Sequence, residues 1–139
     1  MRNLILIVLA AAVLAGCQTA PKQSVDSRTA VRQGISEMSP VEARPAVEAA
    51  YSQLVDVREP AEFAAGHAYR ARNIPLGTLA ADLDKLEKNE PVYLICKTSN
   101  RSREAAKILA GAGFGQVVVI SGGTDAWSNA GLPMETPKQ

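Results

Sequence analysis

Three short and almost wholly apolar runs limit what this 139-residue chain can fold into. They span residues 53–57, 92–95 and 117–120. Runs this short and this apolar are typical of strands that are covered on both faces, as in a parallel sheet. Amphipathic segments separate them, so we predict an α/β fold: one small domain with a mainly parallel central sheet and helices on both faces.

Helical periodicity predicts helices in the connecting segments. Leu79, Leu83 and Leu86 recur at helical spacing, and Pro45 requires either a late start or a kink in the helix that contains it. Trp127 falls in an apolar helical pattern and is expected in the core. The predicted helices span residues 41–51, 60–66, 78–88 and 102–112.

The amino terminus is expected to be a signal peptide rather than part of the fold. Arg2 precedes an apolar run at 4–14, which is shorter than the roughly 20 residues a transmembrane helix needs. The following Leu-Ala-Gly-Cys17 resembles the bacterial lipobox, in which the cysteine becomes the lipid-modified first residue. An ordinary signal peptide with a chance cysteine is the alternative.

This resemblance predicts three parts: a signal peptide at 1–16, a lipidated Cys17 with a flexible tether at 17–30, and a folded domain at 31–139. More than one acyl chain gives lasting membrane attachment. We therefore expect a periplasm-facing protein anchored to a bacterial membrane. Gln18, where an aspartate would indicate inner-membrane retention, favours the outer membrane.

Composition argues against other classes of partner. Net charge is +1 and aromatic residues make up 4%, so no basic and aromatic surface for nucleic acid is expected. Two cysteines and one histidine cannot supply the four ligands of a structural zinc site. We predict no metal and no cofactor.

Cys96 is the one cysteine in the predicted domain, between a strand and a helix. Exported cysteines usually pair, yet a lipidated Cys17 leaves Cys96 without a partner; a disulfide between the two in an unlipidated form stays possible. The thiol is therefore either a packing residue or a nucleophile. It follows a strand at the sheet edge where ligands bind in open α/β folds, as do Asp56, Arg58 and the turn at 121–123.

Chemistry favours the nucleophile. The helix expected to begin near Ser102 points its N–H groups at the loop, and Lys97, Arg101 and Arg103 add positive charge, all of which favour a thiolate. A tight turn of inward N–H groups also binds anions. The expected substrate is a small anion with an atom open to attack by sulfur, and the Cys96 sulfur must then be reachable from solvent.

Four motifs resemble a single rhodanese domain, the thiosulfate sulfurtransferase family. In order along the chain they are LVDVREPAEF (54–63), GHAYRARNIP (66–75), VYLICKTSNRS (92–102) and SGGTDAWSNAGLPMET (121–136). The resemblance implies that Cys96 takes sulfane sulfur from thiosulfate or a similar donor as a persulfide and passes it to a thiol or cyanide. It further implies a cradle of backbone N–H groups, with Lys97 and Arg101 also attracting the anion through their side chains. The cradle residues are Lys97, Thr98, Ser99, Asn100 and Arg101.

Two alternatives remain beside the sulfurtransferase. The first is a carrier or binding module that holds a persulfide with little turnover. The second is a phosphatase or arsenate reductase, whose relatives of this fold use a longer Cys-x5-Arg loop. Here Arg101 closes a Cys-x4-Arg loop and Ser102 occupies the later position, which favours sulfur.

The remaining polar residues near the motifs are given structural or geometric roles. Asp56 and Arg58 are expected to form supporting contacts beneath the loop, and His67 is expected to be structural because attack on sulfane sulfur needs no base. Glycines 122 and 123 are expected to let the 121–123 turn approach the loop closely.

Two positions depart from the family pattern. Ser99 stands where many members have glycine, so a positive φ there would strain it. Arg70 replaces a turn glycine and is expected to add positive charge at the mouth of the site.

Overall fold

The computed structural model describes residues 34–136. The predicted signal peptide, Cys17 and the tether lie outside these residues. Within residues 34–136, no helix is both long and apolar enough to cross a membrane.

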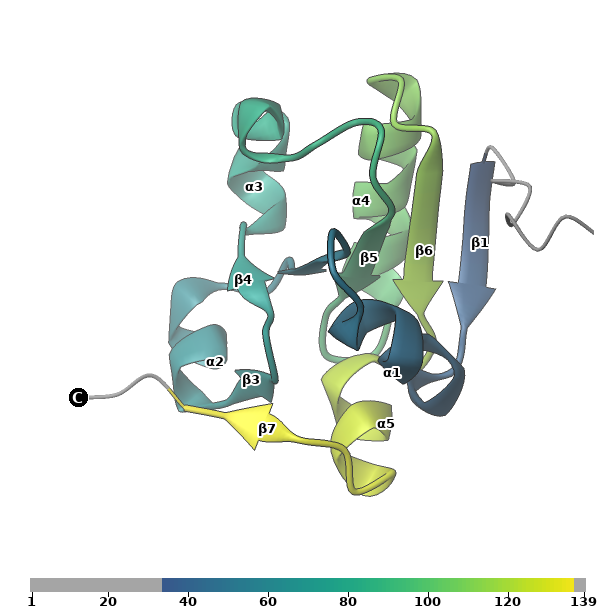
Figure 1. Ribbon diagram of the computed structural model, residues 1–139. Helices are drawn as coiled ribbons and strands as arrows, with labels where there is room; N and C mark the ends of the chain where they lie inside the picture. Colours follow the sequence, from purple (N-terminus) through teal and green to yellow (C-terminus); the bar gives the residue numbers. More distant parts are fainter. Residues whose placement is uncertain (1–33, 137–139) are drawn as a thin grey trace, which may run out of the picture.

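The elements alternate between strand and helix along most of the chain (Figure 1). In order they are β1 (Gly34–Met38), α1 (Pro40–Glu48), β2 (Gln53–Asp56), α2 (Pro60–Ala65), β3 (His67–Ala68), β4 (Arg72–Asn73), α3 (Leu76–Leu79), the 3-10 turn η1 (Leu83–Lys85), β5 (Val92–Ile95), α4 (Asn100–Gly111), β6 (Gln116–Ile120), α5 (Gly123–Asn129) and β7 (Met134–Glu135).

The central sheet has five strands in the order β1-β6-β5-β2-β4, and each neighbouring pair is parallel. The short strands β3 and β7 form a separate antiparallel pair. Because all five central strands run the same way, their carboxyl ends lie at one edge of the sheet. The predicted fold class, with its mainly parallel sheet, is confirmed.

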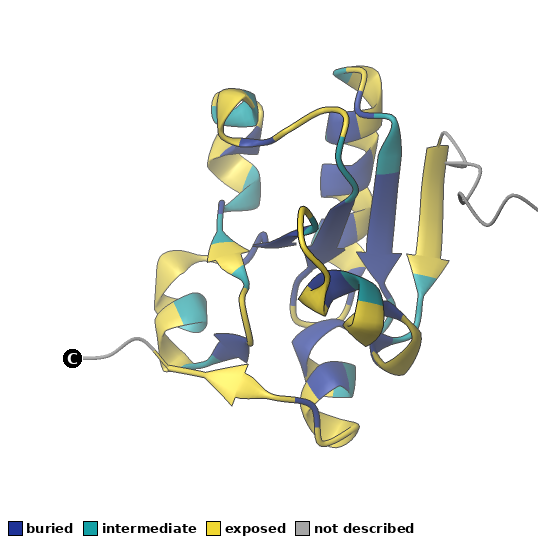
Figure 2. Cartoon of the chain, in the orientation of Figure 1, coloured by how far each residue is buried: buried dark blue, intermediate teal, exposed yellow. Residues whose placement is uncertain are grey.

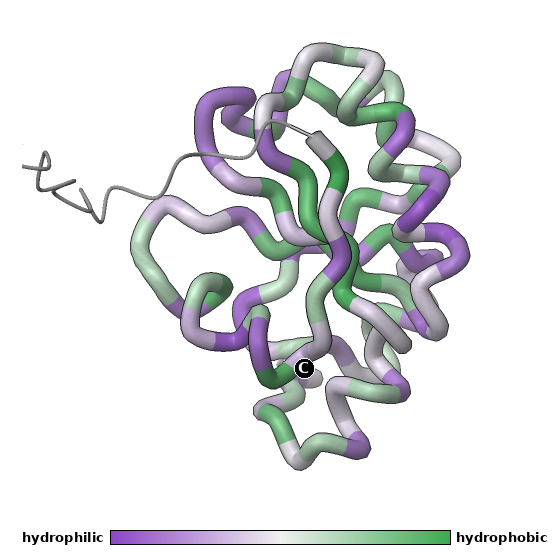
Figure 3. Tube along the Cα trace, turned by 90° about the vertical axis from the view of Figure 1, so that its right-hand side faces the viewer, coloured by the Kyte–Doolittle hydropathy of each residue, from purple (hydrophilic) through white to green (hydrophobic). Residues whose placement is uncertain are grey.

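Alternate residues of the central strands feed two separate cores. Leu94, Val117 and Val119 face the core that α4 covers, whereas Tyr93 and Val118 face the core that includes α1 and α5. This period of two explains why β5 and β6 are apolar at nearly every position (Figures 2 and 3). Trp127 is 1% exposed in the second core, as predicted.

Strand β1 was not predicted. It pairs along its whole length with β6, from Gly34 beside Gln116 to Met38 beside Ile120. Its residues are mostly exposed because it is an edge strand (Figure 2). The segment GISEM therefore lacks the apolar pattern of a buried strand, and its conformation depends on its partner.

The single helix predicted at 78–88 is wrong. The chain instead forms α3, a turn at residues 80–81 and the short η1, which Asp82 precedes. Leu79 and Leu86 are still buried in the core beneath α4. Leucines at helical spacing therefore do not require one continuous helix. Here two short helical segments place them against the same core.

Helix α1 differs from the prediction at both ends. It begins at Pro40, where Ser39 and Glu42 cap each other's backbone N–H groups, and it ends at Glu48 rather than at 51. Pro45 lies inside it, so the helix does not start late. The capping box and a proline in the first turn favour the early start.

Candidate active-site loop

The loop lies where β5 ends and α4 begins, at the carboxyl edge of the sheet. Cys96 follows the last residue of β5, and the loop from Lys97 to Ser99 leads into α4 at Asn100. Asp56 ends the neighbouring strand β2, whose register places it beside Ile95. The structure therefore brings together the segments that the motifs predicted.

Helix α5 binds the backbone of this loop. The Thr124 N–H donates to the Cys96 carbonyl at 2.7 Å, and the Asp125 N–H donates to the Lys97 carbonyl at 3.2 Å. A side chain at Gly123 would overlap the Cys96 carbonyl oxygen and lie 2.5 Å from that of Lys97. The predicted close approach of this turn to the loop is confirmed, and it requires glycine at 123.

These two hydrogen bonds also orient the loop's N–H groups. In a trans peptide the C=O and the following N–H point in opposite directions. With the Cys96 and Lys97 carbonyls held by α5, the N–H groups of Lys97 and Thr98 point away from that helix. None of the N–H groups from Lys97 to Ser102 has an acceptor within residues 34–136. Consecutive free donors of this kind form an anion-binding nest, which the α4 N-terminus reinforces.

Ser99 has φ +76°, in the left-handed region, as expected for a position where glycine is common. Its residue is 2% exposed, and its hydroxyl donates to the Thr98 carbonyl at 2.5 Å. A left-handed residue followed by helical ones turns successive N–H groups to one side, which is the backbone pattern of a nest. The strain of about 1–2 kcal/mol that serine carries there therefore serves the geometry of the loop.

Cys96 is 1% exposed and packs in the core that α4 covers, with Val57, Leu94 and Ala105 among its members. It has no disulfide partner among the residues that the structure describes. The packing role considered for this residue is thus real, and the expectation that its sulfur is reachable from solvent is not met in this structure. Reaction at its sulfur requires a reagent small enough to enter the loop, or a loop that opens.

The Arg101 side chain is held by a carboxylate that sequence analysis missed. Its guanidinium donates two hydrogen bonds to Glu62 of α2, at 2.6 and 2.8 Å. This pairing lowers the pKa of the Glu62 carboxyl from 4.5 to about 2 and raises that of Arg101. Glu62 lies within the REPAEF part of the first motif, and that position was the signal available for it.

Asp56 and Arg58 form the supporting contact that was predicted. Arg58 donates to both Asp56 carboxylate oxygens, at 2.6–3.0 Å, and to the Gly66 carbonyl at 2.8 Å. Asp56 is fully buried and Arg58 is 7% exposed. A buried carboxylate satisfied in this way fixes the end of β2, and Arg58 also joins it to Gly66, which follows the last residue of α2.

The other predicted loop residues are exposed. Lys97, Thr98 and Asn100 face solvent, and the Lys97 ammonium has no hydrogen-bonded partner within 34–136. The Asn100 side-chain amide oxygen (Oδ1) accepts a long 3.5 Å hydrogen bond from Arg103. Lys97 is therefore the loop cation left available to an incoming anion.

His67 is structural in this fold, as expected. Its ring stacks on Phe63 at 3.6 Å, its Nδ1 lies 3.0 Å from the Phe63 carbonyl, and its Nε2 lies 3.8 Å from Glu135. These contacts join α2 to the β3 and β7 pair.

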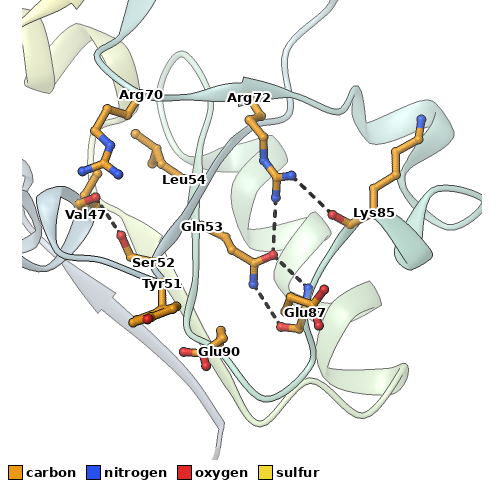
Figure 4. A pocket seen from close by; sticks show the side chains of 10 residues that line it. All are labelled: Val47, Tyr51, Ser52, Gln53, Leu54, Arg70, Arg72, Lys85, Glu87 and Glu90. Atoms are coloured by element: carbon orange, nitrogen blue, oxygen red, sulfur yellow. Dashed lines mark hydrogen bonds between the residues drawn. The ribbon is translucent and has the colours of Figure 1, made fainter.

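Arg70 does not lie at the mouth of the loop, so that expectation is wrong. It keeps a positive φ of 67°, but its guanidinium donates to the Glu48 carbonyl at 2.6 Å. There it lines a hollow of about 420 Å³ around Gln53, which begins β2 (Figure 4). This hollow lies at the amino end of β2, whereas Cys96 follows the carboxyl end of parallel β5.

The fold and the loop define a class: a parallel α/β domain that holds a cysteine beneath a turn of free backbone N–H groups, suited to a small anion. Comparison with known proteins is more specific. Residues 39–130 match the rhodanese-like domain family. The chain belongs to that family.

Similar proteins and solved structures support this family assignment. Thiosulfate sulfurtransferase GlpE of Actinobacillus pleuropneumoniae is 34% identical over 73% of this chain and 94% of that protein. An uncharacterized protein of Bacillus subtilis, YqhL, is 43% identical over 55% of this chain, which spans only 60% of YqhL. A rhodanese-like domain protein from Staphylococcus aureus superposes with a TM-score of 0.66 at 30% identity, over 74% of this chain and 99% of that one.

Gly123→Ala is expected to disrupt the loop. Its Cβ would meet backbone oxygens of Cys96 and Lys97, which cannot move without breaking their bonds to α5. Gly131→Ala is a matched control, because φ is also positive (+68°) but its Cβ meets nothing within 4 Å. Left-handed strain alone costs about 1–2 kcal/mol, and overpacking adds about 1–3 kcal/mol at position 123. Urea unfolding measures the free energy of unfolding of both variants. An equal loss of stability in Gly123→Ala and Gly131→Ala would contradict the role of the close approach.

Glu62→Gln is expected to remove an acid-sensitive part of stability. The low pKa of Glu62 stabilises the fold above its ordinary value of 4.5, and this contribution is lost as pH falls towards about 2. The pair is one-third exposed, so the loss at neutral pH should be only about 0.5–1 kcal/mol. Urea unfolding from pH 7 to about 2 should show the variant and wild type converging in acid. Glu104→Gln, an exposed position on α4, is the control, and a difference independent of pH would refute the assignment.

Proposed function

We propose that this protein is a sulfurtransferase that carries sulfane sulfur as a persulfide on Cys96. The observation that carries the proposal is the set of N–H groups from Lys97 to Ser102, none of which has an acceptor within residues 34–136. They follow Cys96 directly, and Cys96 is the only cysteine in those residues. Membership of the rhodanese family and the likeness to a named thiosulfate sulfurtransferase support it.

The reaction has two steps. The Cys96 thiolate attacks the outer sulfur of thiosulfate or a similar donor; the bond between the donor's two sulfurs breaks, and its electron pair leaves with sulfite. The enzyme then holds Cys–S–S⁻. A thiol or cyanide attacks the outer sulfur, and the Cys96 thiolate returns as the leaving group, which is covalent catalysis through a nucleophile.

Backbone donors suit this intermediate. The terminal sulfur of a persulfide is a small anion, and inward N–H groups at a helix N-terminus stabilise negative charge without bringing a counter-charge of their own. The Arg101 guanidinium is bound by Glu62, so it supports the loop rather than supplying a free cation. Exposed Lys97 supplies long-range attraction for the anionic donor.

Loop size favours sulfur over phosphorus. A phosphoryl group needs room for tetrahedral oxygens and a guanidinium that binds them in a fork. Here the loop from Cys96 to Arg101 is short, and the Arg101 fork is already occupied by the Glu62 carboxylate. A persulfide carrier would use the same loop, so turnover is what separates the carrier from the enzyme.

Thiosulfate is expected to add one sulfur to wild-type protein and none to Cys96→Ser, because only the thiolate can accept it. Intact-protein mass spectrometry after thiosulfate treatment detects the added sulfur, and alkylation of the folded protein tests access to the buried thiol. Thiosulfate–cyanide turnover that is lost in Cys96→Ser supports the enzyme, and a persulfide without turnover supports the carrier. No added sulfur on wild type, or faster release of phosphate from an aryl phosphate, would overturn the proposal.

We further propose that a lipid on Cys17 anchors the protein to a bacterial membrane, facing the periplasm. Gly34, the first described residue, lies at the amino edge of the sheet, opposite the edge that holds Cys96. A tether that joins the domain there attaches at the end of the sheet opposite the active-site loop.

Cys17→Ser is expected to move the protein from the membrane fraction to the soluble fraction, because lasting attachment requires the acyl chains. Fractionation followed by immunoblotting measures this, with Cys96→Ser as the control that should stay with the membrane. Unchanged membrane association of Cys17→Ser would contradict the anchor.

A further inference from the structure

The Ser102 hydroxyl is a buried donor that nothing in the described fold uses. Ser102 is fully buried, and its Oγ is the one buried side-chain nitrogen or oxygen atom without a hydrogen-bond partner within residues 34–136. Buried polar atoms are normally satisfied, so an orphan of this kind needs a reason.

The usual local partner is not used. A helical serine commonly donates to the carbonyl four residues earlier, which here is that of Thr98. That carbonyl accepts the Ser99 hydroxyl at 2.5 Å and receives no hydrogen bond from Ser102. The Ser102 hydroxyl is therefore free within residues 34–136.

Size alone does not account for a serine at this position. The same buried face of α4 continues with Ala105 and Ala106, both fully buried. Alanine is therefore compatible with the spacing between α4 and the sheet, and what Ser102 adds is a hydroxyl.

The direction of the side chain points to the loop. Ser102 lies in the first turn of α4, and the Cα–Cβ bonds of a helix tilt towards its N-terminus. The hydroxyl therefore leans towards the turn whose N–H groups are free. The Cys96 sulfur itself does not accept its hydrogen bond, so this hydroxyl is available to an atom that enters the loop.

We propose that Ser102 binds the outer sulfur of the Cys96 persulfide, donating its hydroxyl hydrogen to that anion. This inference rests on the sulfur-transfer function proposed above and adds a side-chain donor to the backbone cradle. No bond to Ser102 forms or breaks and its proton stays on oxygen. The hydrogen bond stabilises the charged intermediate relative to the free enzyme.

Ser102→Ala tests this with two readouts that move in opposite directions. Removing an unsatisfied buried hydroxyl should leave the melting temperature unchanged or raise it. Loss of one charge-assisted hydrogen bond to the persulfide should slow sulfur uptake from thiosulfate by about tenfold. Ser128→Ala, an exposed serine on α5, is the matched control and should change neither.

The outcomes separate the two proposals. Wild type that takes up no sulfur refutes the function and this inference with it. Wild type that takes up sulfur, with Ser102→Ala equal to it in rate, overturns the inference alone. A lower melting temperature with unchanged uptake per folded molecule assigns Ser102 a structural role and also overturns it. Partial recovery of uptake in Ser102→Thr, checked for folding by its melting temperature, supports the hydroxyl.

Discussion

The structure of the site depends on two hydrogen bonds, from the first turn of α5 to the carbonyls of Cys96 and Lys97. They fix the peptide planes that would otherwise be free to rotate, and planarity then turns the following N–H groups away from α5. Helices α4 and α5 belong to opposite cores of the same sheet. Packing on both faces therefore holds α5 against the loop, and the anion cradle is a consequence of how the domain folds.

Side-chain charge near the loop is largely cancelled within the protein. Asp56 binds Arg58, and Glu62 binds Arg101. What remains to stabilise an anion is the fixed field of backbone dipoles and the α4 N-terminus, aided by exposed Lys97. Such donors keep their orientation without a carboxylate or phosphate to order them. This arrangement favours a persulfide sulfur over a larger oxyanion, whose recognition needs a free guanidinium.

The sequence predicted the elements that are buried, because burial requires a recognisable apolar pattern. Strands β2, β5 and β6 are buried along nearly their whole length, so their apolar runs identified them. Strand β1 is exposed and is a strand only because β6 pairs with it. At the site, Cys96 and the loop followed from their place between a strand and a helix. The Arg101–Glu62 pair links residues 39 positions apart, and no local pattern contains that information.

The burial of Cys96 makes it a packing residue and also bears on its proposed role as a nucleophile. Its residue completes the core beneath α4, and the same packing brings its backbone to the turn that α5 binds. A thiolate in such a place has few water molecules to stabilise it, so the loop donors have to do so. Those donors act over a short distance and reach only atoms inside the loop. In the proposed sulfurtransferase, selectivity for a small sulfur species therefore follows from the same burial that limits access to the thiol.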